Sequence, residues 1–440
     1  MQPLQNPDDV IIPTVVSTRI EEPASFPIPV IYVCEINTME VIIVDRDTNE
    51  EEKSCVPVMK TSTHEDLRTD TSVTLIPGPV RYYHITREVK DAIFGKVYHA
   101  LALELVPVVD LPPMEGEMPQ PPPYNWRGGG GVYTLRHRTP HEEMAVKVYF
   151  KEKLRNLTGQ MSENPLSEFG AMQYLGHRNR YVMGQVGAYQ DGDSVYSLME
   201  FCDGGELYDK LDADGPFNEN LSRRFFLQIL NGLEYCHSMG VAHRDMSLEN
   251  LIYNKHENYV KIIDFGMCLR VPKDEATGTF LYMPPQGRCG KKSYIAPEVI
   301  QNNQNFNPMK VDIWALGVIL FTMMSGFPPV ESANTADPRY RMVAAGHLRT
   351  LIDNWNVSHL MSDSVVNLIE SILRPNPGDR LSLAEIRAHP WVQEGLAAFR
   401  SENGHSNGSG SRSGSYGAMP PNPPAENSNG DALGMAMDAE

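Results

Sequence analysis

The chain has little positive charge for its size: 38 Lys and Arg residues stand against 56 Asp and Glu, a net charge of −18 over 440 residues. Nucleic acids and anionic membrane surfaces are bound through basic patches, so we expect no nucleic acid and no membrane as a main partner. A cationic peptide is a better electrostatic match for such an acidic protein. The composition therefore favours a partner or substrate of opposite charge.

Long hydrophobic runs and cysteine patterns are also missing. The longest apolar stretch, Ile313 to Met324, is roughly half of the 20 residues that a membrane span needs, and the first residues are polar and proline-rich rather than basic and then apolar. The six cysteines show neither disulfide-scaffold nor zinc-ligand spacing. We expect a cytoplasmic or nuclear protein with reduced thiols.

Composition divides the chain into three parts. Residues 1–78 form an N-terminal extension to which no fold can be assigned, 79–395 form one large domain, and 396–440 are so rich in Ser, Gly, Asn and Pro that we expect a disordered tail. Within the domain, a Pro- and Gly-rich stretch at about 107–143 predicts a loop insertion. Its P-Q-P-P-P run at 119–123 is either a spacer or a ligand for a proline-recognition partner.

Hydrophobic periodicity predicts strands in the first half of this domain and helices in the second. The predicted strands are 82–90, 96–106, 144–149 and 195–201, and the predicted helices are 220–238, 311–325, 362–373 and 382–389. Short strand-like stretches also occur earlier, at 10–16, 28–33 and 41–45. The order predicts an α+β fold with a small β-rich lobe and a larger helical lobe.

Two motifs carry chemistry: V-A-H-R-D-M-S-L-E-N at 241–250 and I-I-D-F-G at 262–266. Phosphoryl transfer needs a carboxylate that orients the attacking hydroxyl, metal ligands beside it and a cation on the nucleotide. Asp245 can supply the first, and Asn250 and Asp264 can bind Mg²⁺. The two motifs together indicate a phosphoryl-transfer site.

In this context the chain resembles the eukaryotic protein kinase superfamily, serine/threonine type, over roughly 310 residues. The A-V-K run ending at Lys147 resembles the lysine motif of the third strand, and Glu168 resembles the helix glutamate that pairs with this lysine. The resemblance implies a bilobal protein kinase fold and the cofactors ATP and Mg²⁺. It implies that Lys147 clamps the α- and β-phosphates and that Asp245 accepts the substrate proton.

The resemblance also implies a nucleotide site. L-M-E-F-C-D-G-G-E-L from Leu198 is similar to a kinase hinge, with Met199 as gatekeeper and the backbones of Glu200 and Cys202 as contacts to adenine. The remaining residues that it assigns to the nucleotide are Ala145, Glu206 and Ile252.

The loop that covers the phosphates has two candidates. D-A-I-F-G-K-V at 91–97 has an aromatic tip, a glycine and then a valine, which makes Phe94, Gly95 and Val97 nucleotide contacts. R-G-G-G-G-V at 127–132 has the ordinary distance to Lys147 and stays open as the alternative. We prefer the first, because good strands flank it.

Two departures from the kinase pattern fall in one small site. Ser247 stands where serine/threonine kinases usually carry a Lys, and Lys291 stands where they usually place a Thr that bonds the catalytic Asp. We hypothesise that Lys291 supplies the missing cation from across the cleft and is a further catalytic residue. The alternative is a pseudokinase scaffold that binds nucleotide or partners without transfer.

Four other patterns concern substrates, regulation, packing and the kinase group. Glu206 and Glu249 lie where arginine-directed kinases place carboxylates, which predicts protein substrates with basic residues upstream of the phosphosite. Cations near Cys289 predict a reactive thiolate that is sensitive to oxidation, and the alternative is an inert small apolar residue. In the family, an arginine at the position of Arg380 pairs with the glutamate of I-A-P-E, here Glu298. The closing L-S-L-A-E-I-R-A-H-P-W is in the style of the calcium/calmodulin-dependent group.

Overall fold

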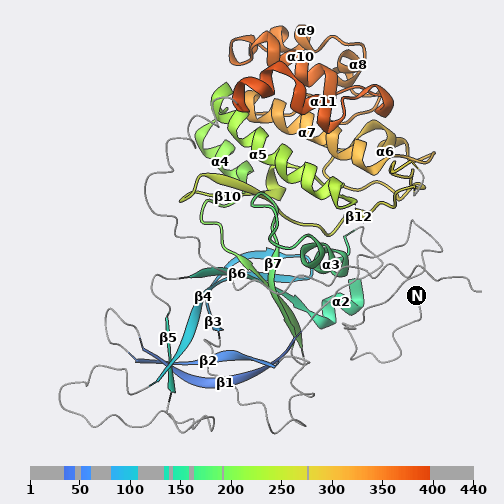
Figure 1. Cartoon of the computed structure of the whole chain (residues 1–440). Coiled ribbons are helices and arrows are strands. Elements are labelled where there is room, and N and C mark those ends of the chain that lie inside the picture. The colour runs from blue at the N-terminus through green and yellow to red at the C-terminus, as the bar shows by residue number, and fades with distance from the viewer. Residues whose placement is uncertain are drawn as a thin grey trace, which may run out of the picture. The chain divides into compact units, whose positions relative to one another are not determined.

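The computed structural model describes residues 34–44, 51–60, 81–107, 133–137, 142–157, 163–190, 193–274 and 277–396. The chain divides after Ala397 into two units, and all described residues lie in the first. In that unit the strands β1 to β8 and the helices α4 to α11 form separate layers (Figure 1). The strand-like stretches at 10–16 and 28–33, the P-Q-P-P-P and G-G-G-G runs and the C-terminal tail lie outside the described residues.

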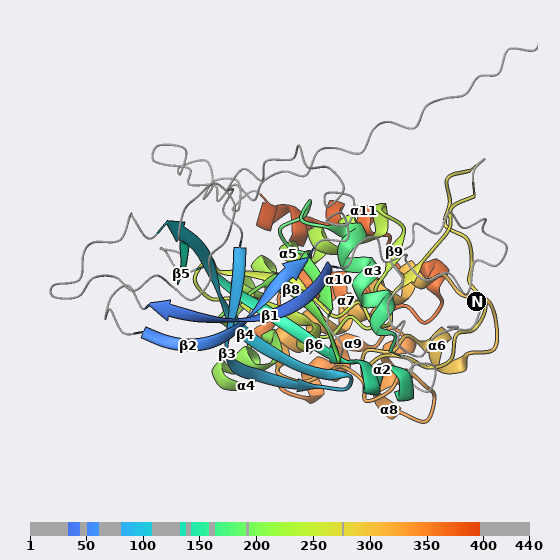
Figure 2. The same ribbon diagram turned by 90° about the horizontal axis from the view of Figure 1, so that it is seen from below.

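The first layer is an eight-stranded sheet. Its strands are β1 (Cys34–Val44), β2 (Glu51–Lys60), β3 (Arg81–Ala92), β4 (Gly95–Pro107), β5 (Tyr133–His137), β6 (Glu143–Phe150), β7 (Gln185–Gln190) and β8 (Ser194–Glu200). They follow the order β2-β1-β5-β4-β6-β8-β7, with β3 paired to β4. β1 also pairs with β7, which closes six strands into a ring. Figure 2 shows β1 and β2 side by side as strands of this sheet.

The four strands predicted between residues 82 and 201 are confirmed as β3, β4, β6 and β8. Two features differ from the prediction. The insertion at 107–143 is not a loop throughout, because residues 133–137 form β5, whose backbone pairs with both β4 and β1. The strand predicted at 41–45 is the end of the longer β1, which pairs antiparallel with β2 over ten residue pairs. Residues 34–60 thus add two strands to the sheet.

Two helices, α2 (Lys151–Leu157) and α3 (Pro165–Leu175), contribute to the core on one face of the sheet. Side chains alternate between the two faces of a strand, so β6 sends Tyr149 to this face and Val148 to the other. Tyr149 packs in a cluster with Leu154 of α2 and Phe169 of α3. The alternation also sends Lys147 toward α3, which is the basis of the site described below.

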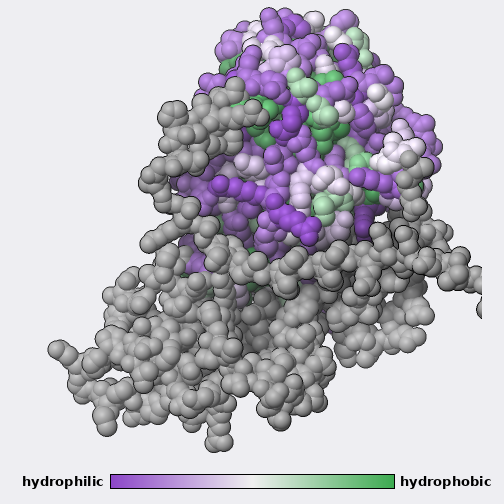
Figure 3. Space-filling model, in the orientation of Figure 1, coloured by the Kyte–Doolittle hydropathy of each residue, from purple (hydrophilic) through white to green (hydrophobic). Residues whose placement is uncertain are grey.

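The second layer contains eight helices among the described residues: α4 (Leu207–Asp214), α5 (Glu219–Ser238), α6 (Pro297–Gln301), α7 (Pro308–Ser325), α8 (Pro338–Ala344), α9 (Leu348–Asn354), α10 (Asp363–Ile372) and α11 (Leu383–Ala388). The four helices predicted from the sequence are confirmed as α5, α7, α10 and α11. Asn218 caps α5 by accepting the amide of Leu221, and α7 ends at Gly326, whose φ of 84° favours glycine. The face visible in Figure 3 is mostly hydrophilic where it is coloured.

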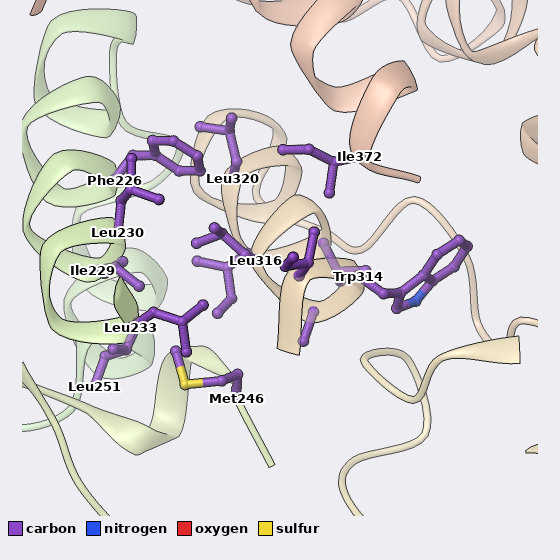
Figure 4. Packing of buried hydrophobic residues seen from close by; sticks show 14 of the residues in the cluster. Phe226, Ile229, Leu230, Leu233, Met246, Leu251, Trp314, Leu316, Leu320 and Ile372 are labelled. Atoms are coloured by element: carbon purple, nitrogen blue, oxygen red, sulfur yellow. The ribbon is translucent and has the colours of Figure 1, made fainter. Parts of the chain in front are cut away.

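The core of this layer lies between α5 and α7. Leu316 and Leu320 of α7 point toward α5, and Met246 and Leu251 lie at the base of the same cluster (Figure 4). α7 is apolar and long enough to cross a membrane, but 94% of it is buried inside the protein, as expected for a core helix. Met246 lies inside the V-A-H-R-D-M-S-L-E-N motif, and Leu251 follows it directly. Because both side chains are packed in this core, the core holds the motif in place.

Candidate active site

Asp312 of α7 holds the loop that follows β9 (Val241–Ala242). Its fully buried carboxylate accepts the backbone N–H of His243 at 2.8 Å and of Arg244 at 2.7 Å, and it lies 2.8 Å from His237 Nε2. Arg244 has a φ of 68°, which is uncommon for a residue with a side chain. The two bonds to Asp312 hold this backbone and thereby aim the next residue, Asp245.

A short hairpin brings the two motifs together. Asn250 ends a 3₁₀ turn at Leu248–Asn250 and directly precedes β10 (Leu251–Asn254), which pairs with β11 (Tyr259–Ile262). The amide of Ile263 donates to Asn250 O at 3.0 Å, so the next residue, Asp264, begins beside Asn250. Beyond it, β12 (Leu269–Arg270) returns to pair with β9.

Asn250 also ties the loop to Asp245. Its Nδ2 donates to Asp245 O at 2.7 Å and to Asp245 Oδ2 at 3.0 Å. These bonds use the amide nitrogen, so the amide oxygen is the atom that a metal would take. Burial and the charge of Asp264 raise the pKa of Asp245, which makes it a stronger proton acceptor than an exposed Asp.

Alternate residues of this loop present unsatisfied polar atoms. Among the buried side-chain atoms without a hydrogen-bond partner in the described part of the chain are Asp245 Oδ1, Ser247 Oγ and Glu249 Oε2. Leaving a buried polar atom unpaired costs about 1–3 kcal/mol, so three in one short loop indicate a surface built to bind something polar. Asp245 Oδ1 is the atom that the bond to Asn250 leaves for a substrate hydroxyl.

Lys147 and Glu168 form a buried ion pair, with Lys147 Nζ 2.8 Å from Oε1 and 2.7 Å from Oε2. The hydroxyl of Tyr149 donates to Oε2 at 2.6 Å. Burial lowers the pKa of Lys147, but the charges of Glu168 and Asp264 outweigh it and raise that pKa above its ordinary value. Lys147 is therefore a permanent cation between the sheet, α3 and the D-F-G motif.

Carboxylate oxygens gather around this lysine. One oxygen from each of Glu163, Glu168 and Asp264 lies within 4.8 Å of the others. Glu163 packs on the D-F-G motif, because the next residue, Asn164, donates its amide to Gly266 O at 2.8 Å. Burial and the charge of Asp264 raise the pKa of Glu163 to about 7. Carboxylate and amide oxygens are the ligands that Mg²⁺ takes, so Asp264 and Asn250 fit this metal by their chemistry.

The hairpin at 91–97 lies directly against the strand of Lys147. β3 and β4 are joined by a turn at Ile93 and Phe94, Gly95 pairs with Tyr149, and Val97 pairs with Lys147. A Cβ on Gly95 would lie 1.7 Å from Val148 O, so only glycine fits there. This arrangement supports the first candidate for the phosphate-covering loop. The alternative at 127–132 lies outside the described residues.

Phe94 differs from the prediction. Its side chain is 1% exposed and packs with Tyr149 and Phe169 under the hairpin, whereas Ile93, 46% exposed, forms the tip. Burying a phenyl ring against two aromatic residues is more favourable than leaving it in solvent above a polar site. In this structure Phe94 is a core residue and does not face the nucleotide site.

The predicted adenine contacts lie along the hinge. Met199 and Ala145 are paired across β8 and β6, and Cys202 is buried, with its pKa raised to about 12 by burial. Glu200 turns its carboxylate to Lys261, with Oε2 3.2 Å from Nζ. That leaves the backbone of Glu200, rather than its side chain, as the atoms for a nucleotide, in line with the hinge resemblance.

Two further predicted residues meet at the start of α4. Glu206 and Ile252 form an isolated antiparallel bridge, so the end of the hinge pairs with β10. The Glu206 carboxylate contacts Lys90 of β3. The Glu206 carboxylate therefore already forms an ion pair with a lysine of this chain.

Lys291 lies beside the catalytic loop, with Nζ 3.0 Å from Glu249 Oε1. Its charge acts on Asp245, whose pKa it lowers slightly against the effect of burial. The prediction for Cys289 is wrong: burial raises the pKa of this thiol, although Arg244 Nη2 donates to Sγ at 2.9 Å. Desolvation outweighs the nearby cation, so the thiol is protonated at neutral pH.

The pairing of Arg380 with Glu298 is confirmed. Arg380 donates from Nη1 to Glu298 Oε1 at 2.7 Å and from Nη2 to Oε2 at 2.6 Å, and both side chains are buried.

Tyr149 and Glu163 are two residues of the site that the sequence motifs did not predict. Tyr149 could have been found, because residues two apart on a strand share a face and Lys147 was already assigned. No motif marks Glu163.

Comparison with known proteins agrees with this geometry. The sequence model of the protein kinase domain matches residues 128–392. CBL-interacting serine/threonine-protein kinase 15 of Arabidopsis thaliana is 33% identical over 265 residues, which cover 60% of this chain and 58% of that protein. CBL-interacting protein kinase 1 of Oryza sativa subsp. japonica is also 33% identical, over 60% of this chain and 53% of its own length. The chain spans less than two thirds of the length of these relatives. It belongs to the protein kinase domain family.

Proposed function

We propose that this chain is an ATP-dependent protein kinase that transfers the γ-phosphate of Mg-ATP to serine and threonine hydroxyls of protein substrates. The observation that carries the proposal is the convergence of three charged residues. Asp264 has a carboxylate oxygen within 4.8 Å of one from Glu168, which binds Lys147 at 2.8 Å. Asp264 also follows Ile263, whose amide binds the backbone of Asn250, and Asn250 in turn binds Asp245 at 3.0 Å. The three groups therefore share one site although they come from β6, the catalytic loop and the D-F-G motif. Phosphoryl transfer requires this combination of cation, metal ligand and proton acceptor.

The position of each residue supports its proposed role. Lys147, fixed by Glu168, binds the α- and β-phosphates. Asn250 and Asp264 would hold Mg²⁺, which would supply positive charge to neutralise the phosphates. Asp245 Oδ1 accepts the hydrogen bond of the substrate hydroxyl and takes its proton as the oxygen attacks phosphorus.

The nucleotide base lies between the sheet and β10. Val97 of β4 and Ala145 of β6 lie on one face of the sheet. Val97 pairs with Lys147, and Lys147 is two residues from Ala145 on β6, so the three side chains share that face. Ile252 of β10 and the gatekeeper Met199 close the other sides, and the backbones of Glu200 and Cys202 supply hydrogen bonds. We infer these contacts from the placement of the residues and from the hinge resemblance.

Two finer assignments belong to this proposal. Glu206 and Glu249 favour substrates with basic residues upstream of the phosphosite. The closing L-S-L-A-E-I-R-A-H-P-W segment, which contains helix α11, supports a resemblance in style to the calcium/calmodulin-dependent group.

The proposal is tested by incubating the purified full chain with γ-labelled ATP, Mg²⁺ and a library of serine, threonine and tyrosine peptides. We expect label on serine and threonine, and loss of transfer when EDTA removes the metal. Nucleotide binding without transfer to any peptide would favour the pseudokinase scaffold instead. Transfer to tyrosine alone would contradict the assigned class.

A further inference from the structure

Among the described residues, only one of the two carboxylate oxygens of Glu249 has a partner. Oε1 lies 3.0 Å from Lys291 Nζ, and Oε2 is buried without a partner among the residues that the structure describes. The Glu249 side chain is 25% exposed and that of Lys291 41% exposed, so solvent and a bound peptide can reach the pair. An ion pair of this exposure contributes little to stability and is readily exchanged.

Lys291 stands next to the transfer site. Lys291 follows Gly290, where a Cβ would lie 3.3 Å from Asp245 Oδ1. The positive charge of Lys291 also acts to lower the pKa of Asp245. Ser247, two residues after Asp245, offers a buried hydroxyl without a partner among the described residues and brings no cation. Lys291 instead brings an ammonium to this site, on a side chain long enough to turn toward a transferring phosphoryl group.

We propose that Glu249 holds Lys291 back in the free enzyme, and that a basic side chain of the substrate takes its place on Glu249 and releases Lys291 to the phosphoryl group. This inference rests on the proposed kinase function and names a regulation of the same site. The substrate class is a serine or threonine peptide with Arg or Lys upstream of the phosphosite. A basic substrate then completes the catalytic charge as well as binding.

The reaction step is an ordinary phosphoryl transfer from ATP. The bond between the γ-phosphorus and the oxygen that bridges to the β-phosphate breaks, and the substrate oxygen forms the new bond to phosphorus. The hydroxyl proton goes to Asp245, and ADP leaves with the electron pair of the broken bond. Lys291 donates hydrogen bonds to the γ-phosphoryl oxygens, where charge is spread in the transition state.

The test uses two serine peptides that differ only in an upstream Arg or the neutral isostere citrulline. Binding is measured by fluorescence anisotropy with a non-hydrolysable ATP analogue, and kcat is measured with ATP. For Lys291→Ala we expect tighter binding of the Arg peptide, by about threefold, because Glu249 no longer has an internal partner. Turnover should fall roughly a hundredfold. Lys292→Ala is the matched control, since Lys292 pairs with Glu331 at 2.6 Å and should change neither value.

Glu249→Gln supplies the opposite arm. It releases Lys291 permanently, so kcat for the citrulline peptide should rise toward that for the Arg peptide, whereas the Arg peptide binds more weakly. Unchanged binding of the Arg peptide by Lys291→Ala, or an equal fall in kcat for both peptides with Glu249→Gln, would overturn the inference. If the parent transfers phosphate to neither peptide, the kinase function fails, and the binding measurement alone still decides whether Lys291 competes for Glu249.

Discussion

The hydroxyl of Tyr149 donates to Oε2 of Glu168 at 2.6 Å, on the carboxylate that also binds Lys147. Tyr149 is buried against Phe169 of α3, with ring centroids 4.9 Å apart. One residue thus joins the strand of the lysine to the helix of the glutamate by both a ring contact and a hydrogen bond. Tyr149 is a positioning residue, because it acts on the nucleotide through Glu168 and Lys147.

Replacing Tyr149 by Phe keeps the ring and removes the bond. We expect the KM for ATP to rise by about tenfold, since losing a hydrogen bond to a buried charge costs about 1.5 kcal/mol. The bond from Tyr149 lowers the pKa of Glu168, so its removal raises that pKa and moves the acid limb of the pH profile to higher pH. Tyr174→Phe is the control: it removes a hydroxyl from α3, the helix of Glu168, that donates to Met239 O, and it should leave the profile in place. An unmoved acid limb in Tyr149→Phe would refute the role.

Gly95→Ala should destabilise the β3–β4 hairpin. The added methyl group would lie 1.7 Å from Val148 O, so the hairpin has to separate from β6. We expect a loss of several kcal/mol of stability or of ATP binding, as for other overpacked sites. Differential scanning fluorimetry with and without ATP measures both. Gly378→Ala, where a Cβ makes only ordinary contacts of 3.6 Å, is the control. Equal melting temperatures for the two variants would contradict the close packing.

Arg380→Met should lower the free energy of unfolding by about 3–5 kcal/mol, because it leaves the buried carboxylate of Glu298 without its partner. Arg387→Met is the comparison: Arg387 pairs with Glu234 on a partly exposed surface, and its loss should cost about 1 kcal/mol or less. Urea denaturation measures both variants. A cost for Arg380→Met as small as that for Arg387→Met would show that the buried pair contributes no more than a surface one.

Cys289 should react slowly with thiol reagents. Its raised pKa leaves little thiolate at neutral pH, so alkylation by iodoacetamide should be slower than for a free cysteine peptide and should speed up at a higher pH than for that peptide. Mass spectrometry of timed samples follows the labelling, with Cys289→Ser to identify the modified peptide. Rapid labelling at pH 7 would restore the reactive thiolate that the neighbouring cations predicted.

Sequence reasoning placed the parts of the site that depend on motif order. Lys147, Glu168 and Asp264 come together because the strand of the lysine, the helix of the glutamate and the D-F-G motif have a fixed order in the fold. Asn250 contacts Asp245 because the two residues lie five positions apart on one loop. It did not predict contacts set by three-dimensional packing. The burial of Phe94 depends on how the hairpin folds onto α3. The raised pKa of Cys289 depends on desolvation, which sequence neighbours do not report.

The N-terminal part shows the same limit. β5 pairs with β1 across almost one hundred positions in the sequence, for example at Ile43 and Leu135. Such long-range pairing leaves only a weak local signal, and the prolines and glycines around 107–143 indicated a loop. Strand β1 was predicted only at its end, because Val41 to Val44 form a continuous apolar run, whereas polar and acidic residues separate the apolar ones before it.

The most direct test of the account compares the parent chain with Asp245→Asn. The amide keeps the size of the side chain but cannot take a proton, so we expect transfer of γ-phosphate to a serine peptide to fall by a factor of about 10²–10⁴. ATP affinity should change little, because Lys147 and the metal ligands remain. Equal transfer rates for the two proteins would contradict the assignment of Asp245 as proton acceptor and, with it, the proposed mechanism.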